Sequence, residues 1–147
     1  PRARFELPDR WHLTLLYLGS PQKQALSTLQ RHFPALAQGQ FPIPLCLDTI
    51  GSFKQGRVCW LGAQMLPAAL VDCVDRLRII AAQSGIGCED RPFRPHITLL
   101  RATQAWHFPE QPVPAIDWQI DHFSLNVSRQ GRYHTLAYWR FEEKYNG

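Results

Sequence analysis

A short pattern that occurs twice constrains the fold more than any other feature of this sequence. The residues His-x-Thr-Leu occupy positions 12–15 and again 96–99, and each copy lies in an apolar run typical of a β-strand. A helix is expected after the first copy and another before the second. A repeat of this kind is typical of an internal duplication. We therefore expect a duplicated domain with pseudo-twofold symmetry. Because strand pairs are interleaved with single helices along the sequence, we expect an α+β domain with duplicated, largely antiparallel sheets.

The alternation of side chains along a strand gives the pattern a chemical meaning. His12 and Thr14 point to one face, and Leu13 to the other; His96 and Thr98 repeat this arrangement. A His and a Thr two residues apart lie about 6.5–7 Å from each other along a strand, so both can contact oxygens of one tetrahedral anion. If the two strands come together across a groove, two imidazoles and two hydroxyls converge on a single phosphate.

Histidine suits proton transfer at such a site because the pKa of an unperturbed imidazole is about 6.5. One neutral ring can accept a proton from an attacking water, while the other, protonated, donates to the leaving oxygen. The threonine hydroxyls would donate hydrogen bonds to the non-bridging phosphate oxygens. The pattern predicts in-line phosphoryl transfer without a metal or another cofactor, and its expected catalytic residues are His12, Thr14, His96 and Thr98.

Three further segments accompany the repeat. Residues 57–62 are Arg-Val-Cys-Trp-Leu-Gly, residues 91–101 are Arg-Pro-Phe-Arg-Pro-His-Ile-Thr-Leu-Leu-Arg, and residues 128–133 contain Ser-x-x-Gly-x-Tyr. Together with the two motifs, they resemble the two-histidine phosphoesterase superfamily and, within it, the bacterial RNA 2′,3′-cyclic phosphodiesterases, also called RNA 2′-5′ ligases. The resemblance covers nearly all of residues 1–147. It implies one bilobal domain with helices on the outside and a central cleft.

The same resemblance implies an activity and assigns roles that spacing alone leaves open. It implies hydrolysis of RNA 2′,3′-cyclic phosphate ends to 2′-phosphates, together with reversible 2′-5′ joining of RNA. His12 would donate a proton to the departing 3′-oxygen, and His96 would activate water. The expected partners are RNA or nucleotides with 2′,3′-cyclic phosphate or 2′-phosphate ends. Family members usually have a strand and a helix before the first motif, and we expect both to be missing here because that motif begins at residue 12.

Four other residues are expected to contact the substrate. We expect Arg101 to share a face with the second motif and to reach phosphate or an adjacent nucleotide, with a surface ion pair as an equally good alternative. Phe93, Trp60 and Tyr133 could stack on a base, as could Phe53, although aromatic residues more often belong to the core.

Composition limits the alternatives. The 147 residues, 45% of them hydrophobic, suffice for one core, and a net charge of +4 is too small to indicate a surface that coats nucleic acid. A run of apolar residues long enough for a membrane span is absent from the sequence, as is a signal peptide, so we expect a cytoplasmic protein, and a monomer. The four cysteines lack zinc-site spacing, and we interpret them as small buried hydrophobic residues.

Local patterns predict about six strands and two helices. The strands are expected at residues 11–18, 41–50, 57–61, 96–100, 118–127 and 133–141. The helices are expected from Ser20 to about Phe33, where Pro34 would end the first, and from Pro67 to Ser84. A turn at residues 54–56 favours a hairpin, and residues 108–114, which are rich in proline, are expected to lack regular structure.

Two other functions remain open at this point. A non-catalytic module that binds nucleotides or RNA ends could use the same residues, and binding of AMP or a 2′-phosphate without turnover would identify it. A metallohydrolase ranks last because the sequence places neither a carboxylate nor a third histidine at ligand spacing from the two motifs.

Overall fold

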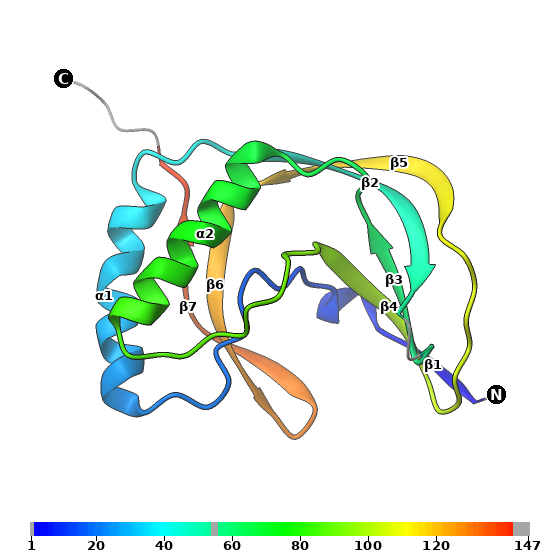
Figure 1. Ribbon diagram of the computed structural model, residues 1–147, viewed down its shortest axis with the longest axis horizontal. Coiled ribbons are helices and arrows are strands. Elements are labelled where there is room, and N and C mark those ends of the chain that lie inside the picture. Colours follow the sequence, from blue (N-terminus) through cyan, green and yellow to red (C-terminus); the bar gives the residue numbers. More distant parts are fainter. Residues whose placement is uncertain (1, 54–55, 143–147) are drawn as a thin grey trace. The chain divides into compact units, whose positions relative to one another are not determined.

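The structure is a computed structural model that describes residues 2–53 and 56–142. Figure 1 shows its α+β architecture, with helices and antiparallel strands, as the order of strands and helices in the sequence predicts. The chain forms two compact units. The first contains Pro1–Leu15, Leu45–Leu66 and Pro92–Trp118, and the second contains Leu16–Pro44, Pro67–Arg91 and Gln119–Gly147.

A five-stranded sheet organises the first unit. Its strand order is β1-β4-β3-β2-β5, and the β1–β4, β4–β3 and β3–β2 pairs are antiparallel. The β2–β3 pair is the hairpin that the sequence predicts, although Lys54 and Gln55 of its turn lie outside the described residues. The strands are β1 (Ala3–Phe5), β2 (Ile43–Ser52), β3 (Val58–Gly62), β4 (His96–Ala102) and β5 (Gln111–Ile120).

A β-bulge interrupts the pairing of β4 with β3. Trp60 pairs with Thr98 and Cys59 pairs with Leu100, which leaves Leu99 as the extra residue. A bulge of this kind shifts the alternation of side chains by one position. Ile97 and Leu100 therefore share one face and are both buried, although they are three residues apart.

The first His-x-Thr motif is less regular than its sequence predicts. Residues 11–18 are expected to form a strand, but the structure has only an isolated antiparallel bridge there, between Leu13 and Ile97. The chain reaches this bridge after β1, which pairs with β4, and a short 3-10 helix (Pro8–Arg10). The other side of residues 11–18 has no strand partner among the described residues. Regular pairing of this segment is therefore short.

The second unit contains two helices and a two-stranded antiparallel sheet. The helices are α1 (Lys23–Ala37) and α2 (Ala68–Gln83), and the sheet consists of β6 (His122–Arg129) and β7 (Arg132–Arg140). The side chain of Phe33 in α1 makes edge contacts with Phe123, at a ring distance of 5.2 Å, and with Trp139, at 4.7 Å. On α2, Leu70, Val74 and Leu77 are buried on one stripe, as the helical spacing predicts.

Pro34 does not end the first helix, contrary to the sequence prediction. The helix begins at Lys23 rather than beside Ser20, and it continues through Pro34 to Ala37. Proline removes one helical hydrogen bond, but Leu36 and Ala37, in the turn that follows, are at most 4% exposed. Burial of these apolar side chains opposes the local preference of proline.

The region before β6 also differs from the prediction. Residues 108–114 are not wholly irregular, because β5 begins at Gln111 and includes Pro112 and Pro114. β5 is the last strand of the sheet, and an edge strand tolerates proline because one of its sides needs no ladder hydrogen bonds. The single strand expected at residues 118–127 is divided at Asp121 into β5 and β6, which belong to different sheets.

The expectation that the cysteines are buried is confirmed only in part. Cys59 and Cys73 are buried, and burial raises the pKa of the Cys73 thiol to about 11, but Cys46 is exposed.

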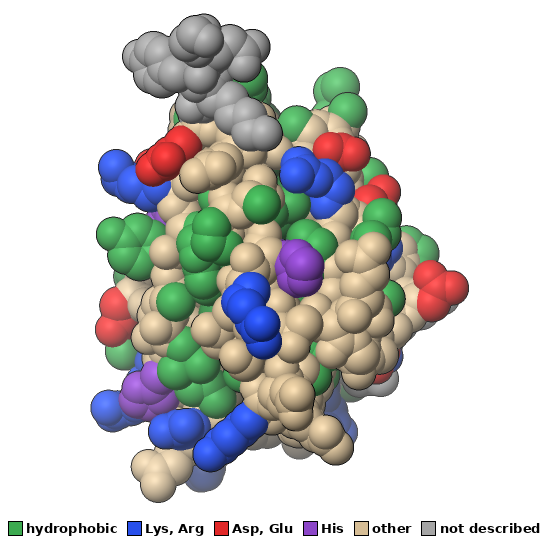
Figure 2. Space-filling model, turned by 90° about the vertical axis from the view of Figure 1, so that its left-hand side faces the viewer, with side chains coloured by type: hydrophobic (Ala, Val, Ile, Leu, Met, Phe, Trp, Pro, Cys, Tyr) green, Lys and Arg blue, Asp and Glu red, His purple; other side chains and the backbone are tan. Residues whose placement is uncertain are grey.

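On the face that Figure 2 shows, basic side chains lie among acidic and apolar ones. The two helices among the described residues are too short or too polar to cross a membrane.

The position of Pro34 leads to a first prediction. Pro34→Ala restores a backbone donor at an exposed helical position, so we expect the free energy of unfolding to rise by about 1–2 kcal/mol. Urea unfolding followed by circular dichroism measures this change. Pro67→Ala, at the N-terminal cap of α2, is the control and should have a smaller effect. An unchanged or lower stability in Pro34→Ala would contradict the prediction.

Candidate active site

The bridge between Leu13 and Ile97 brings the two motifs together within the first unit. Because the bridge is antiparallel, its register places His12 beside Thr98 and Thr14 beside His96. All four side chains then project from the face opposite to Leu13 and Ile97. We call this surface the His-Thr face. The convergence expected from the sequence is thus present, but it arises from direct pairing of neighbouring segments.

The same register fixes the approximate spacing of the two histidines. His12 and His96 are diagonal neighbours across the pair, and such positions are separated by about 7–8 Å. The two threonines occupy the other diagonal. A local twofold axis through the bridge relates the two His-Thr pairs, so a tetrahedral group near this axis can contact an imidazole on each side.

Equivalent hydrogen bonds hold both imidazole rings. The Nδ1 atom of His12 lies 2.8 Å from the carbonyl oxygen of Arg10, and the Nδ1 atom of His96 lies 2.8 Å from that of Arg94. A carbonyl oxygen only accepts hydrogen bonds, so Nδ1 must carry the proton in each ring. In the neutral ring, Nε2 is therefore the nitrogen without a proton. This tautomer is the one required if Nε2 exchanges protons with a reactant.

The indole of Trp60 lies flat on the His-Thr face. A Cβ atom placed on Gly51 would lie 2.5 Å from Cζ2 of Trp60, and one on Gly62 would lie 3.0 Å from Cζ3. The missing side chains of these two glycines therefore make room for the ring. Its other face is covered by the guanidinium of Arg94, whose Cζ lies 5.2 Å from the ring centroid. Trp60 is 4% exposed, so neither ring face is open for the base stacking that the sequence suggests.

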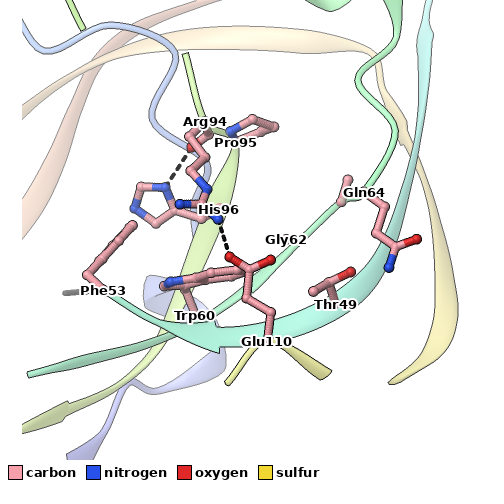
Figure 3. Close-up of a pocket in the computed structure, with 10 residues that line it drawn as sticks. Thr49, Phe53, Trp60, Gly62, Gln64, Arg94, Pro95, His96 and Glu110 are labelled. Atoms are coloured by element: carbon pink, nitrogen blue, oxygen red, sulfur yellow. Dashed lines mark hydrogen bonds and ion pairs between the residues drawn. The ribbon is translucent and has the colours of Figure 1, made fainter. Parts of the chain in front are cut away.

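A pocket opens beside His96 (Figure 3). Arg94 forms an ion pair with Glu110 above Trp60, and the ring of Phe53 meets the imidazole of His96 edge-on at 4.9 Å. The described residues that line this pocket come from β2, β3, the start of β4 and the segment before β5, and they are Thr49, Phe53, Trp60, Gly62, Ala63, Gln64, Arg94, Pro95, His96 and Glu110.

Arg101 shares the His-Thr face because of the bulge at Leu99. Strict alternation from His96 would place Arg101 on the opposite face, but the bulge reverses the alternation, and Arg101 pairs with Val58 in register with Trp60. Its Nε donates to Oε1 of Glu6 at 3.0 Å. The surface ion pair that the sequence suggests as an alternative role for Arg101 is therefore present. The bond to Glu6 uses Nε, so the terminal nitrogens of Arg101 remain potential phosphate donors.

Phe93 and Tyr133 are not among the described residues that line this pocket. Phe93 is half-buried in the segment before β4. Tyr133 belongs to the second unit, where it lies exposed near the start of β7 and pairs with Ser128.

Sequence reasoning missed Thr49, Gln64 and Glu110. Of these, Thr49 and Gln64 belong to segments whose pairing follows from the hairpin, whereas Glu110 lies in the stretch expected to be irregular and gave no signal. Within the described part of the chain, the structure has no group of three or more histidine, cysteine and carboxylate side chains that could hold a metal ion.

Comparisons with known proteins agree with this geometry. A family model described as the 2′-5′ RNA ligase superfamily matches residues 7–132. The RNA 2′,3′-cyclic phosphodiesterase of Escherichia coli K12 is 36% identical over 138 residues, which are 89% of this chain and 76% of that protein. The protein of the same name from Thermotoga maritima is 27% identical over 82% of this chain and 67% of its own length.

Solved structures show the same similarity. The crystal structure of E. coli LigT complexed with 3′-AMP has a TM-score of 0.75 and 34% sequence identity, and the match covers 95% of this chain and 81% of that one. A protein of Thermus thermophilus has a TM-score of 0.81, with 97% of this chain and 84% of that chain covered. Its 24% identity supports the fold alone.

The packing of Trp60 against Gly51 leads to a second prediction. In Gly51→Ala the new methyl group collides with the indole, so we expect a loss of about 1–3 kcal/mol in the free energy of unfolding and a shifted tryptophan fluorescence spectrum. Gly87→Ala is the matched control, because a Cβ atom there meets nothing within 4 Å. Equal stability of the two variants would show that the glycine is not needed to seat the ring.

Proposed function

Because this chain belongs to the 2′-5′ RNA ligase superfamily, we propose that it hydrolyses RNA 2′,3′-cyclic phosphate ends to 2′-phosphates. The observation that carries this proposal is the pair of equivalent Nδ1–carbonyl hydrogen bonds on His12 and His96, which gives both rings the same tautomer. Two such imidazoles beside one phosphorus can supply a general base and a general acid without a metal ion. The RNA 2′,3′-cyclic phosphodiesterases among the relatives support the same activity.

The proposed reaction uses one histidine on each side of the phosphorus. Nε2 of His96 takes a proton from water, and the water oxygen forms a bond to phosphorus. The bond from phosphorus to O3′ breaks, and its electron pair remains on O3′, which takes a proton from Nε2 of the protonated His12. The product is a 2′-phosphate with a free 3′-hydroxyl. Each proton transfer of this kind contributes about 10²–10⁴ to the rate.

Three further groups are proposed to bind the phosphate. The hydroxyls of Thr14 and Thr98 donate to its non-bridging oxygens, where negative charge grows in the transition state. Arg101 reaches the same oxygens through its terminal nitrogens, while its Nε stays bonded to Glu6, whose side chain is 13% exposed. Phe93, Tyr133 and Trp60 stay proposals as base contacts; for Trp60 that contact would be indirect, through Arg94.

The expected substrates are RNA or nucleotides with 2′,3′-cyclic phosphate or 2′-phosphate ends. Crystal structures of E. coli LigT complexed with 3′-AMP and with ATP support binding of nucleotides by this chain. Reversal of the same chemistry would join RNA through a 2′-5′ bond. A single domain, a cytoplasmic location and a monomeric state stay predictions of the sequence.

A third prediction follows from the paired histidines. His12→Ala and His96→Ala each remove a proton-transfer group, and we expect each to reduce kcat for hydrolysis of a 2′,3′-cyclic mononucleotide at least about 100-fold. His32→Ala, on an exposed position of α1, is the control and should retain full activity. Thermal unfolding confirms that the variants fold. Full activity in either motif variant would overturn the proposed mechanism, and binding of AMP without turnover by the unaltered protein would indicate a binding module.

A fourth prediction concerns pH and metal ions. One histidine must be neutral and the other protonated, so kcat/KM for the cyclic mononucleotide should pass through a maximum and fall at both lower and higher pH. Excess EDTA should leave the rate unchanged. A kcat/KM that only rises or only falls with pH would contradict the paired roles. Recovery of lost activity on addition of zinc after chelation would favour a metallohydrolase.

A further inference from the structure

The side chain of Glu6 lies between two arginines on the His-Thr face. Its Oε1 atom lies 3.0 Å from Nε of Arg101 and 3.7 Å from a terminal nitrogen of Arg4. The register of β1 with β4 places Arg4 opposite Arg101, and opposite residues of an antiparallel pair project from the same face. We call these three side chains the Arg-Glu-Arg cluster. The proposed hydrolysis uses Arg101 alone, and Arg4 has no part in it.

Burial and charge suit this cluster to binding an anion. The Glu6 side chain is 13% exposed, whereas those of Arg4 and Arg101 are 71% and 50% exposed. One carboxylate balances only one of the two guanidinium charges, so the cluster keeps a positive charge that faces solvent. Ion pairs as exposed as these contribute little to the stability of a fold. Stability alone therefore does not account for a second arginine at this position.

The cluster lies on the side of β4 that carries the first motif. β4 has two edges, and β3 pairs with one of them, so β1 and the bridge at Leu13 lie along the other (Figure 1). Arg4 and the segment with His12 are thus on the same side of β4. The pocket beside His96 is lined from β2, β3 and the start of β4, and none of the three cluster residues is among its described lining residues.

An RNA end carries a second anion on this same side. In the proposed reaction His12 protonates the leaving O3′, so the ribose that carries O3′ lies on the side of His12. The 5′-carbon of that ribose bears the phosphodiester that joins the terminal nucleotide to the rest of the RNA. A cyclic mononucleotide lacks this phosphate. Arginine suits such a group because its planar fork of donors matches two phosphate oxygens.

We propose that Arg4 binds the phosphodiester on the 5′ side of the terminal nucleotide and so makes an RNA end a better substrate than a cyclic mononucleotide; this inference rests on the function proposed above. Arg101 stays with the reacting phosphate, and Glu6 holds the two guanidinium groups side by side. Arg4 determines specificity without touching the reacting atoms. A phosphate contact carries no sequence information, so the preference should be the same whichever bases the RNA end contains.

Two substrates test the proposal. Adenosine 2′,3′-cyclic phosphate has no 5′-phosphate, whereas the dinucleotide ApA with a 2′,3′-cyclic end contains the phosphodiester. Arg4→Ala removes the guanidinium, so we expect kcat/KM for the dinucleotide to fall about tenfold more than kcat/KM for the mononucleotide. Arg4→Lys keeps the charge without the fork and should lose less. Because Arg4 is 71% exposed, both variants should fold, and thermal unfolding checks this.

A neutral linkage separates the effect of the phosphate from that of the second nucleoside. The same dinucleotide with an uncharged methylphosphonate in place of the phosphodiester keeps both bases. With the unaltered protein, we expect this replacement to lower kcat/KM about as much as Arg4→Ala does. In Arg4→Ala the replacement should have no further effect. A further loss of the same size there would show that another group binds the phosphate, and it would overturn the assignment.

A second exposed arginine provides the control. Arg76→Ala, on α2, removes an equal charge and should leave the ratio of the two kcat/KM values unchanged. Equal losses on both substrates in Arg4→Ala would overturn the proposal, because they would place Arg4 at the reacting phosphate. Unchanged activity on both would overturn it as well. An unaltered protein that hydrolyses neither substrate would refute the proposed function itself, which is a result distinct from an unchanged ratio.

Discussion

A single antiparallel contact between Leu13 and Ile97 determines where the two His-Thr pairs of this molecule lie. The contact is one bridge rather than a long ladder, yet it aligns two segments that are 84 residues apart in the sequence. It buries the side chain of Ile97 on one face and leaves the two His-Thr pairs on the other. Because the pairing is antiparallel, each histidine faces the threonine of the other motif. The symmetry of the site therefore follows from strand geometry.

The rest of the sheet supports this arrangement through two local irregularities. The bulge at Leu99 lets β4 present His96, Thr98 and Arg101 on one face while Ile97 and Leu100 remain buried on the other. The two glycines under Trp60 let its indole lie flat, and that ring in turn supports the guanidinium of Arg94. The bulge interrupts the regular pairing of two strands, and the glycines leave two strand positions without side chains. Both features increase the number of polar groups beside His96.

The sequence predicted the fold class, the second helix and the convergence of the two motifs, because each leaves a periodic or repeated pattern. It failed where tertiary burial or position in the sheet outweighed a local preference. Pro34 lies inside a helix because the residues after it are buried, and Pro112 lies in a strand because that strand is at an edge. The bulge at Leu99 and the ion pair of Glu110 leave no pattern in one sequence, since both depend on which strands are neighbours.

The groups that fix the two imidazole tautomers belong to the main chain. The acceptors are the carbonyl oxygens of Arg10 and Arg94, and every amino acid supplies the same oxygen at these positions. Evolution can therefore replace either arginine without altering which ring nitrogen holds the hydrogen. The charge and shape around the reacting centre can diverge among descendants of this gene, whereas the protonation pattern is inherited with the path of the backbone.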